Sequence, residues 1–344
     1  MRELLLNILR CPLCKGSNIS LETHKEDDLE IKSGRVLCKG CNISYQIEGG
    51  IVNFLNSSAS KDVMNEIKAM DEDEYIKDEE GNRYRITKDI IERFKTKFLS
   101  FPEGDGSYFF RRGGSFQSIA EGSDRFYSTL DYMSLTGKEN VLEIGACFSY
   151  ASFKFAKKGC RVVALDISNY LKASELFIRR SYFDRVFSDM HNTPFKDNSF
   201  DIVFGSAVLH HSKDLKMAFR EIYRILKPGG RLFLINESAR GIFEKIHPSF
   251  EEMSKKGFSD TSYTIAEWKK GASMGGFRKI KINFLSLASD YITRHRNRGT
   301  KDNISLRLAY FFKAHKVLEG LILFLLIPAR FLVRPKSWRM VCCK

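Results

Sequence analysis

VLEIGACFSY (residues 141–150), RVVALDIS (161–168), FSDMHNTPFKDNSFDIVFGSAVLHH (187–211) and LKPGGRLFLINE (226–237) are the four stretches that decide the fold of this 344-residue chain. Each contains a short apolar run rich in Val, Ile, Leu and Phe, and each run ends in Glu, Asp or Gly. Segments of helix length separate the runs. This pattern predicts a buried parallel sheet with ligand-binding groups at the carboxyl ends of its strands. We therefore expect a nucleoside-containing ligand at that edge.

The turn after the first run indicates which nucleoside. A dinucleotide-binding turn needs several glycines, so that backbone amides can approach a pyrophosphate, and here only Gly145 is present. Glu143 would repel phosphate but suits a ligand that carries an ammonium and a sulfonium, as S-adenosylmethionine (SAM) does. Asp166 lies 21 residues after Gly145, where an acid can accept both hydrogens of a ribose diol. Asp189 could accept from the adenine amino group, with Met190 beside the ring.

Two further motifs make the region similar to a known family. They are Pro194-Phe-x-Asp-x-Ser-Phe-Asp201 and Leu226-Lys-Pro-Gly-Gly230. With them, residues 124–236 resemble the class I SAM-dependent methyltransferases of the type-11 branch, which is related to ubiquinone-biosynthesis enzymes. The resemblance implies an α/β fold with a Rossmann-like, seven-stranded sheet, helices on both faces, and the cofactor across the first two strand ends.

The candidate cofactor-binding residues all lie in or just after the apolar runs. They are Glu143, Gly145, Cys147, Asp166, Ile167, Asp189, Met190 and Ser206. An acid at a strand end is often only a helix cap or a solvated turn, but three acids after three successive runs favour a ligand site. The chain departs from the family pattern at the second and third loop glycines, which are Cys147 and Ser149 here.

A candidate general base follows the fourth strand of the expected sheet. SAM is already an activated methyl donor, so the protein needs chiefly to orient the acceptor in a dry site. An acceptor that must lose a proton also needs a base. His210 and His211 face the transferred methyl in this fold, and we place His211 slightly ahead; Glu237 is a weaker candidate. A histidine pair at this position can also be scaffold that hydrogen-bonds a neighbouring loop.

The N-terminal region carries four cysteines at metal-ligand spacing. Cys11 and Cys14 form one CxxC pair, and Cys38 and Cys41 form another. Two such pairs are typical of a structural zinc held by four thiolates, with no open coordination position. Two disulfides are the alternative, but residues 1–10 do not look like a signal peptide. We therefore expect structural Zn²⁺ and a reducing, cytoplasmic compartment.

This segment resembles the zinc-ribbon modules that accompany or activate methyltransferases, and also the ribbon that precedes the methyltransferase domain of certain ribosomal-RNA guanine methyltransferases. A ribbon of about 55 residues buries little core, so we expect the metal to supply its folding energy and its core to be separate from that of the catalytic domain.

The net charge of +14 is concentrated at one end of the chain. Residues 261–344 hold 17 Lys and Arg against 4 Asp and Glu, whereas residues 1–260 hold 39 against 38. The same tail contains the apolar run from Gly320 to Ala329, about half the length of a membrane span. A short apolar helix among basic and aromatic residues suits peripheral contact with anionic lipid. It could equally cover the core, and contact with RNA phosphates is a third reading.

These observations divide the chain into four predicted parts. They are a zinc ribbon (1–57), a helical linker or lid (58–115), a methyltransferase domain (116–290) and a basic, apolar, helical C-terminal segment (291–344). We expect methyl transfer to a small-molecule or lipid- or glycan-precursor acceptor. The alternatives are an RNA base methyltransferase that uses the ribbon for recognition, and a non-catalytic adaptor. The sequence predicts neither the acceptor atom nor the oligomeric state.

Overall fold

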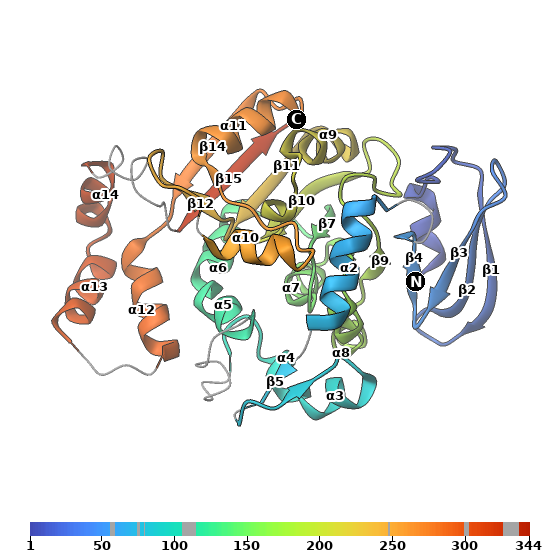
Figure 1. The fold of residues 1–344 in the computed structure, drawn as a ribbon, viewed down its shortest axis with the longest axis horizontal. Helices are drawn as coiled ribbons and strands as arrows, with labels where there is room; N and C mark the ends of the chain where they lie inside the picture. Colours follow the sequence, from blue (N-terminus) through green and yellow to red (C-terminus); the bar gives the residue numbers. More distant parts are fainter. Residues whose placement is uncertain are drawn as a thin grey trace.

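One continuous sheet organises the molecule (Figure 1). The computed structural model describes residues 1–55, 59–73, 76–78, 80–104, 115–246, 248–298, 303–325 and 337–344. Within these ranges, eleven strands pair in the order β1-β2-β3-β4-β9-β8-β7-β10-β11-β15-β14.

Seven of these strands form the predicted methyltransferase sheet. They are β7 (Asn140–Ile144), β8 (Arg161–Asp166), β9 (Asp184–Phe187), β10 (Phe200–Ser206), β11 (Leu226–Ile235), β14 (Lys279–Phe284) and β15 (Trp338–Cys343). The first five are mutually parallel, and β15 runs antiparallel to both β11 and β14. The expectation of a Rossmann-like seven-stranded sheet is confirmed.

Helices cover both faces of this sheet because successive strand residues point to opposite sides. On β7, Leu142 joins one buried cluster, together with residues of α9 (Leu215–Ile225) and α11 (Ile265–Met274). Val141 joins the other, together with residues of α6 (Ser123–Met133), α7 (Tyr150–Lys157) and α8 (Glu175–Ile178). The near-continuous apolar strands noted in the sequence are thus buried on both faces.

The ribbon extends the catalytic sheet and does not form a separate body. It consists of the 3₁₀ helix η1 (Glu3–Ile8) and the strands β1 (Ile19–Glu26), β2 (Ile31–Cys38), β3 (Ser44–Glu48) and β4 (Ile51–Asn53). β4 pairs in parallel with β9, with Val52 opposite Val186. Buried residues of the ribbon belong to the same cluster as catalytic-domain residues. The expectation of separate cores is therefore wrong, because the edge strand β9 offered backbone groups and an apolar face that the ribbon covers.

A buried ion pair also joins the two parts. Glu30, between β1 and β2, accepts a hydrogen bond from Arg185 on β9. Both side chains are almost completely buried. Arg185 additionally donates to the carbonyl of Gly49 at 3.0 Å. Loss of Glu30 would leave the Arg185 guanidinium buried without a countercharge, so this contact fixes the ribbon on its edge of the sheet.

The segment between ribbon and sheet is mostly helical. It contains α2 (Lys61–Asp73), the short strands β5 (Ile76–Lys77) and β6 (Arg83–Tyr84), α3 (Lys88–Arg93), α4 (Lys95–Leu99) and α5 (Ser115–Glu121). Phe116 of α5 and Phe126 of α6 are buried against the sheet domain.

The C-terminal region contradicts one predicted boundary. It contains α10 (Pro248–Lys255), the short strands β12 (Ala239–Arg240) and β13 (Tyr263–Thr264), and then α12 (Leu287–Arg298), α13 (Ile304–Ala314) and α14 (Lys316–Leu325). The last residues form β15, inserted between β11 and β14. Residues 291–344 are therefore not a purely helical appendage, because the sheet is completed by the end of the chain. Among the described helices, none has the length and apolarity needed to span a bilayer.

Candidate active site and metal centre

A cavity of about 980 Å³ opens at the carboxyl ends of the parallel strands. All eight predicted cofactor residues line it, and so do both predicted histidines: Glu143, Gly145, Cys147, Asp166, Ile167, Asp189, Met190, Ser206, His210 and His211. Residues of α2, α5 and α10 and Trp338 of β15 complete the wall. The volume is at the upper end for a ligand pocket, which leaves room for an acceptor beside a nucleoside.

Glu143, the single acid of β7, is buried and lines this cavity. Its Oε2 accepts hydrogen bonds from the amide of Ser152 at 2.7 Å and from the hydroxyl of Ser152 at 2.5 Å. No cationic side chain among the described residues forms an ion pair with it. Burial raises the pKa of Glu143 to about 8, and the neighbouring charge of Asp166 adds to the increase. A buried carboxylate without a countercharge fits the ammonium end of SAM.

Asp166, at the end of β8, is held in place by backbone amides. Oδ2 accepts from Cys147 N at 2.6 Å, and Oδ1 accepts from Ile167 N and Ser168 N at 2.7 Å each. Burial raises the pKa of Asp166 as well. The carboxylate thus links the ends of β7 and β8 at the position where the resemblance places the cofactor ribose.

The turn after β7 has a left-handed backbone at three positions, of which only Gly145 is a glycine. Gly145, Cys147 and Ser149 have φ values of 67°, 47° and 60°. A Cβ on Gly145 would lie 2.4 Å from Val208, so this position requires glycine. At Cys147 and Ser149 a left-handed backbone costs roughly 1–2 kcal/mol each. The departure from the family pattern therefore changes side chains while the turn itself is preserved.

Asp189, the predicted adenine acceptor, has a histidine partner. Its Oδ1 accepts from His191 N at 2.8 Å and lies 2.7 Å from His191 Nδ1. Burial alone would raise the pKa of Asp189, but the contact with His191 keeps it below its usual range. His191 Nε2 lies 2.7 Å from the hydroxyl of Ser212. This histidine also lines the cavity, and the sequence did not single it out.

His210 is oriented by Glu237, which follows β11. Glu237 accepts from the amides of Val208, Leu209 and His210 at 3.0 to 3.1 Å, and its Oε2 lies 2.8 Å from His210 Nδ1. Burial would raise the pKa of Glu237, but these contacts lower it. Nε2 of His210 is thereby directed away from Glu237, and it lies 3.9 Å from Asp260 Oδ1.

His211 contacts two acids that sequence reasoning missed. Its Nδ1 lies 3.0 Å from Oε1 of Glu66 on α2 and 2.9 Å from Oδ1 of Asp260 in the loop after α10. Burial lowers the pKa of His211, but the two carboxylates outweigh that effect and raise it to about 10. Glu66 and Asp260 come from distant segments without a motif, so no local sequence signal could have paired them with the histidines.

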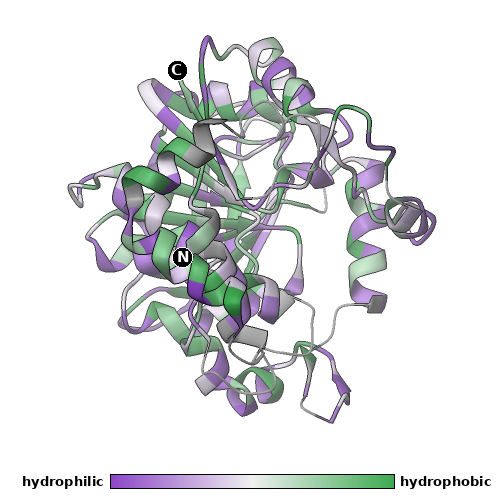
Figure 2. Cartoon of the chain, turned by 90° about the vertical axis from the view of Figure 1, so that its left-hand side faces the viewer, coloured by the Kyte–Doolittle hydropathy of each residue, from purple (hydrophilic) through white to green (hydrophobic). Residues whose placement is uncertain are grey.

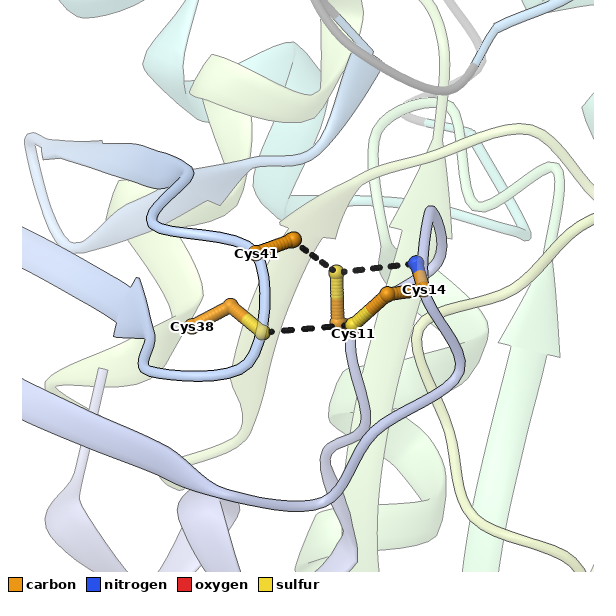
Figure 3. A group of neighbouring side chains, drawn as sticks. All are labelled: Cys11, Cys14, Cys38 and Cys41. Carbon is orange, nitrogen blue, oxygen red and sulfur yellow. Dashed lines mark hydrogen bonds between the residues drawn. The ribbon is translucent and has the colours of Figure 1, made fainter.

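The four ribbon cysteines form a compact cluster (Figure 3). Cys11 Sγ lies 3.6 Å from Cys41 Sγ, and Cys14 Sγ lies 3.5 Å from Cys38 Sγ. Sulfur atoms about 2.3 Å from a shared tetrahedral zinc would be about 3.8 Å apart, so the cluster fits that ion. All eight cysteines of the chain are free thiols, which contradicts the disulfide alternative.

The fold and the cavity together are those of a class I SAM-dependent methyltransferase. Residues 142–234 match the family described as "Methyltransferase domain", and residues 2–50 match the family described as "Trm112p-like protein". The chain thus carries a class I methyltransferase domain preceded by a Trm112p-like module with a four-cysteine cluster.

Curated relatives match the methyltransferase region. A demethylmenaquinone methyltransferase of Corynebacterium efficiens is 34% identical over 116 residues, which are 33% of this chain and 49% of the relative. The human thiol S-methyltransferase TMT1A is 30% identical over 131 residues, which are 36% of this chain and 52% of the relative. The chain therefore spans about half the length of these two relatives.

Solved methyltransferase structures are also similar. A phosphoethanolamine N-methyltransferase 2 of Haemonchus contortus matches with a TM-score of 0.48 and 18% identity, over 80% of this chain and 60% of the other. A Haloferax volcanii complex of the Trm112 methyltransferase activator with a methyltransferase matches with a TM-score of 0.43 and 16% identity, over 66% and 92% of the two chains.

Glu143 should make SAM binding depend on pH. With its pKa raised to about 8, Glu143 is mostly neutral at lower pH and must release its proton to bind an ammonium. Affinity should therefore rise with pH, by up to about tenfold per pH unit, between about pH 6 and about pH 8, and then fall as the ammonium of SAM loses its own proton. Calorimetric titration with SAM across this range measures the effect.

The Glu143→Gln variant should lose most of this dependence and should bind weakly throughout. Glu121→Gln, a change at another buried glutamate of the cavity wall, serves as the matched control and should retain it. An unchanged pH profile in Glu143→Gln would show that this carboxyl does not meet the cofactor.

Loss of one ribbon cysteine should weaken the whole chain. We expect Cys38→Ser to lose the zinc of the four-cysteine cluster and also to lower the unfolding temperature of the catalytic domain, because the two share one core. Elemental analysis measures the metal. Fluorescence of Trp268 and Trp338, both buried in the catalytic domain, follows unfolding there.

Cys343→Ser, a change in β15 outside the cluster, controls for loss of a thiol and should keep the zinc. Equal zinc content in Cys38→Ser and wild type would rule out the metal centre. An unshifted tryptophan transition despite loss of zinc would mean that the ribbon unfolds independently.

Proposed function

We propose that this chain transfers the methyl group of SAM to a small, predominantly apolar acceptor, of the size of a lipid or glycan precursor. The observation that carries the proposal is the continuity of the cavity. One cavity is lined both by the strand-end acids and by Val63 and Met70 of α2, Met217 of α9 and Phe250 of α10. The relatives named for demethylmenaquinone and thiol acceptors support a small-molecule acceptor.

In this proposal the strand-end acids hold the cofactor and the histidine end of the cavity meets the acceptor. Glu143 would bind the ammonium, Asp166 the ribose hydroxyls, and Asp189 with Met190 the adenine, while Gly145, Cys147, Ile167 and Ser206 complete the contact surface. SAM supplies an electrophilic methyl. A bond forms between the acceptor atom and the methyl carbon as the carbon–sulfur bond breaks, and the electron pair remains on sulfur. The walls exclude water and align the acceptor, and His210 and His211 would contact it.

RNA methylation is the second candidate, because of the Trm112p-like match. The ribbon itself argues for a different role. Residues 1–57 hold seven Lys and Arg against seven Asp and Glu, so the module has no positive excess with which to bind phosphates. Its sheet pairing and shared core suit a module that stabilises the catalytic domain. A non-catalytic adaptor is the third candidate.

Untargeted labelling distinguishes these candidates. The full chain is incubated with SAM carrying a tritiated methyl group and with lipid, RNA and small-molecule extracts that are then separated. We expect label in the organic-soluble or small-molecule fraction. Asp166→Ala should reduce the label at limiting SAM by about fivefold or more, since lost hydrogen bonds to a buried carboxylate cost about 1–3 kcal/mol.

Asp131→Ala, a change of the same type at an exposed position on α6, should leave the label unchanged. Label confined to RNA would replace the proposal with the second candidate. No incorporation into any fraction would favour the adaptor.

We further propose that α13 and α14 contact anionic membranes. These helices project beside α12 at one end of the molecule (Figure 1), on the side that faces the viewer in Figure 2. Large apolar side chains on them are exposed: Ile304, Leu308, Tyr310, Phe311, Val317, Leu318 and Leu321. This exposure argues against a core-covering role for the described part of the tail, and the positive charge of residues 261–344 suits anionic lipid. Residues 326–329 of the apolar run lie outside the described residues.

Co-sedimentation with vesicles tests this contact. Binding should increase with the anionic lipid fraction and decrease with salt. Val317→Glu, at a position 80% exposed, should weaken binding by at least about tenfold, because burial of a valine contributes about 1.5–3 kcal/mol.

Leu4→Glu in the ribbon, at a position 71% exposed, is the matched control and should bind as wild type does. Equal binding by Val317→Glu and Leu4→Glu would contradict the assignment to α13 and α14.

A further inference from the structure

Four ionisable side chains from three separate segments lie together in the lining of the cavity. Glu66 comes from α2, His210 and His211 from the 3₁₀ turn η4 (Leu209–His211), and Asp260 from the loop after α10. Ligand atoms of His210, His211 and Asp260 all lie within 4.8 Å of one another. Glu66 Oε1 lies 3.0 Å from His211 Nδ1. The segments are also tied by backbone, because Thr261 N donates to the carbonyl of His210 at 3.0 Å.

The atoms that converge here are close but poorly aligned with one another. Glu66 Oε1, His211 Nδ1 and Asp260 Oδ1 are buried, yet none makes a hydrogen bond of acceptable geometry within the described part of the chain. Glu66 is only 3% exposed. Buried polar atoms are almost always satisfied, and three that point to one place indicate a group between them.

His210 has the support that metal-binding histidines usually have. Such a histidine donates its other ring N–H to a carboxylate, which fixes the tautomer and the ring orientation. Glu237 occupies that position at His210 Nδ1, and three backbone amides hold Glu237 in turn. The nitrogen that remains, Nε2, is the one directed toward Asp260.

From this geometry we infer a binding site for one divalent first-row transition-metal ion, with His210, His211 and Asp260 as its ligands and Glu66 beside His211. Donor atoms about 2.1 Å from an ion are about 3 Å apart when adjacent and about 4.2 Å apart when opposite. Asp260 Oδ1 lies 2.9 Å from His211 Nδ1 and 3.9 Å from His210 Nε2, which is compatible with that range. Two imidazoles and a carboxylate suit Mn²⁺, Fe²⁺ or Zn²⁺ better than Mg²⁺ or Ca²⁺, which prefer all-oxygen sites.

The ion would also connect the cavity wall. Asp260 belongs to the loop that follows α10, so a bound ion would hold this loop against η4, while Glu66 of α2 contacts His211 beside it. A bound divalent ion lowers the pKa of a hydroxyl or thiol beside it. That consequence rests on the proposed methyl transfer, whereas binding of the ion does not.

Mn²⁺ is the probe that tests the site, because thiolate clusters select softer ions and the ribbon cysteines should not take it up. The full chain, with its ribbon zinc in place and dialysed against metal-free buffer, is titrated with Mn²⁺, and free ion is followed by electron paramagnetic resonance without SAM or acceptor. We expect one Mn²⁺ per chain. Asp260→Asn should weaken binding at least tenfold, with circular dichroism confirming the fold.

Two further variants separate positioning from ligation. Glu237→Gln should weaken Mn²⁺ binding by about 10- to 100-fold through His210, although Glu237 is not itself a ligand. His191→Gln, a change at another cavity-lining histidine that also has a carboxylate partner, should bind Mn²⁺ as wild type does.

Absence of Mn²⁺ binding in the wild type would overturn the inference and leave His211 as a protonated histidine paired with two acids. Equal binding by wild type and Asp260→Asn would overturn it too. Neither result bears on methyl transfer, which the labelling experiment measures separately.

Discussion

Parallel pairing of β7 with β8 and β10 is the constraint on which the rest of the site depends. Because the strands run in one direction, their carboxyl ends gather at one edge, and each contributes a polar group there. This arrangement places Glu143 and Asp166 near enough for the charge of Asp166 to raise the pKa of Glu143. Both carry raised pKa values because burial disfavours their charged forms. The protein thus maintains two buried acids whose charged forms are destabilised.

The local part of this site was predictable from sequence, and the long-range part was not. Strand-end acids and CxxC pairs each lie within a few residues of a recognisable pattern, so their positions followed from spacing. Glu66 and Asp260 lie in an ordinary helix and an ordinary loop. Only the packing of α2 and the loop after α10 over η4 brings them to the histidines, and no periodicity in the sequence encodes that packing.

The two corrections to the predicted domains have one physical origin. Edge strands need partners, and the catalytic sheet finds one on each side within the same chain. β4 of the ribbon covers β9, and β15 at the end of the chain enters between β11 and β14. The predicted boundaries at residues 57 and 290 rested on the cysteine pairs of the ribbon and on the basic, apolar composition of the tail. Hydrogen bonding across a sheet edge leaves no trace in composition, so the continuity of the sheet could not be inferred.

Pairing of β4 with β9 also makes β1 the edge strand on this side of the sheet. An open edge invites pairing with another chain. On β1 the last four residues are exposed and include His24, Lys25 and Glu26, and the pairing of β1 with β2 is irregular around Lys25. Charge and irregular pairing are the devices by which natural sheets discourage such additions. With β9 covered, the edge on this side of the sheet is therefore a charged and irregular strand, which disfavours pairing with another chain.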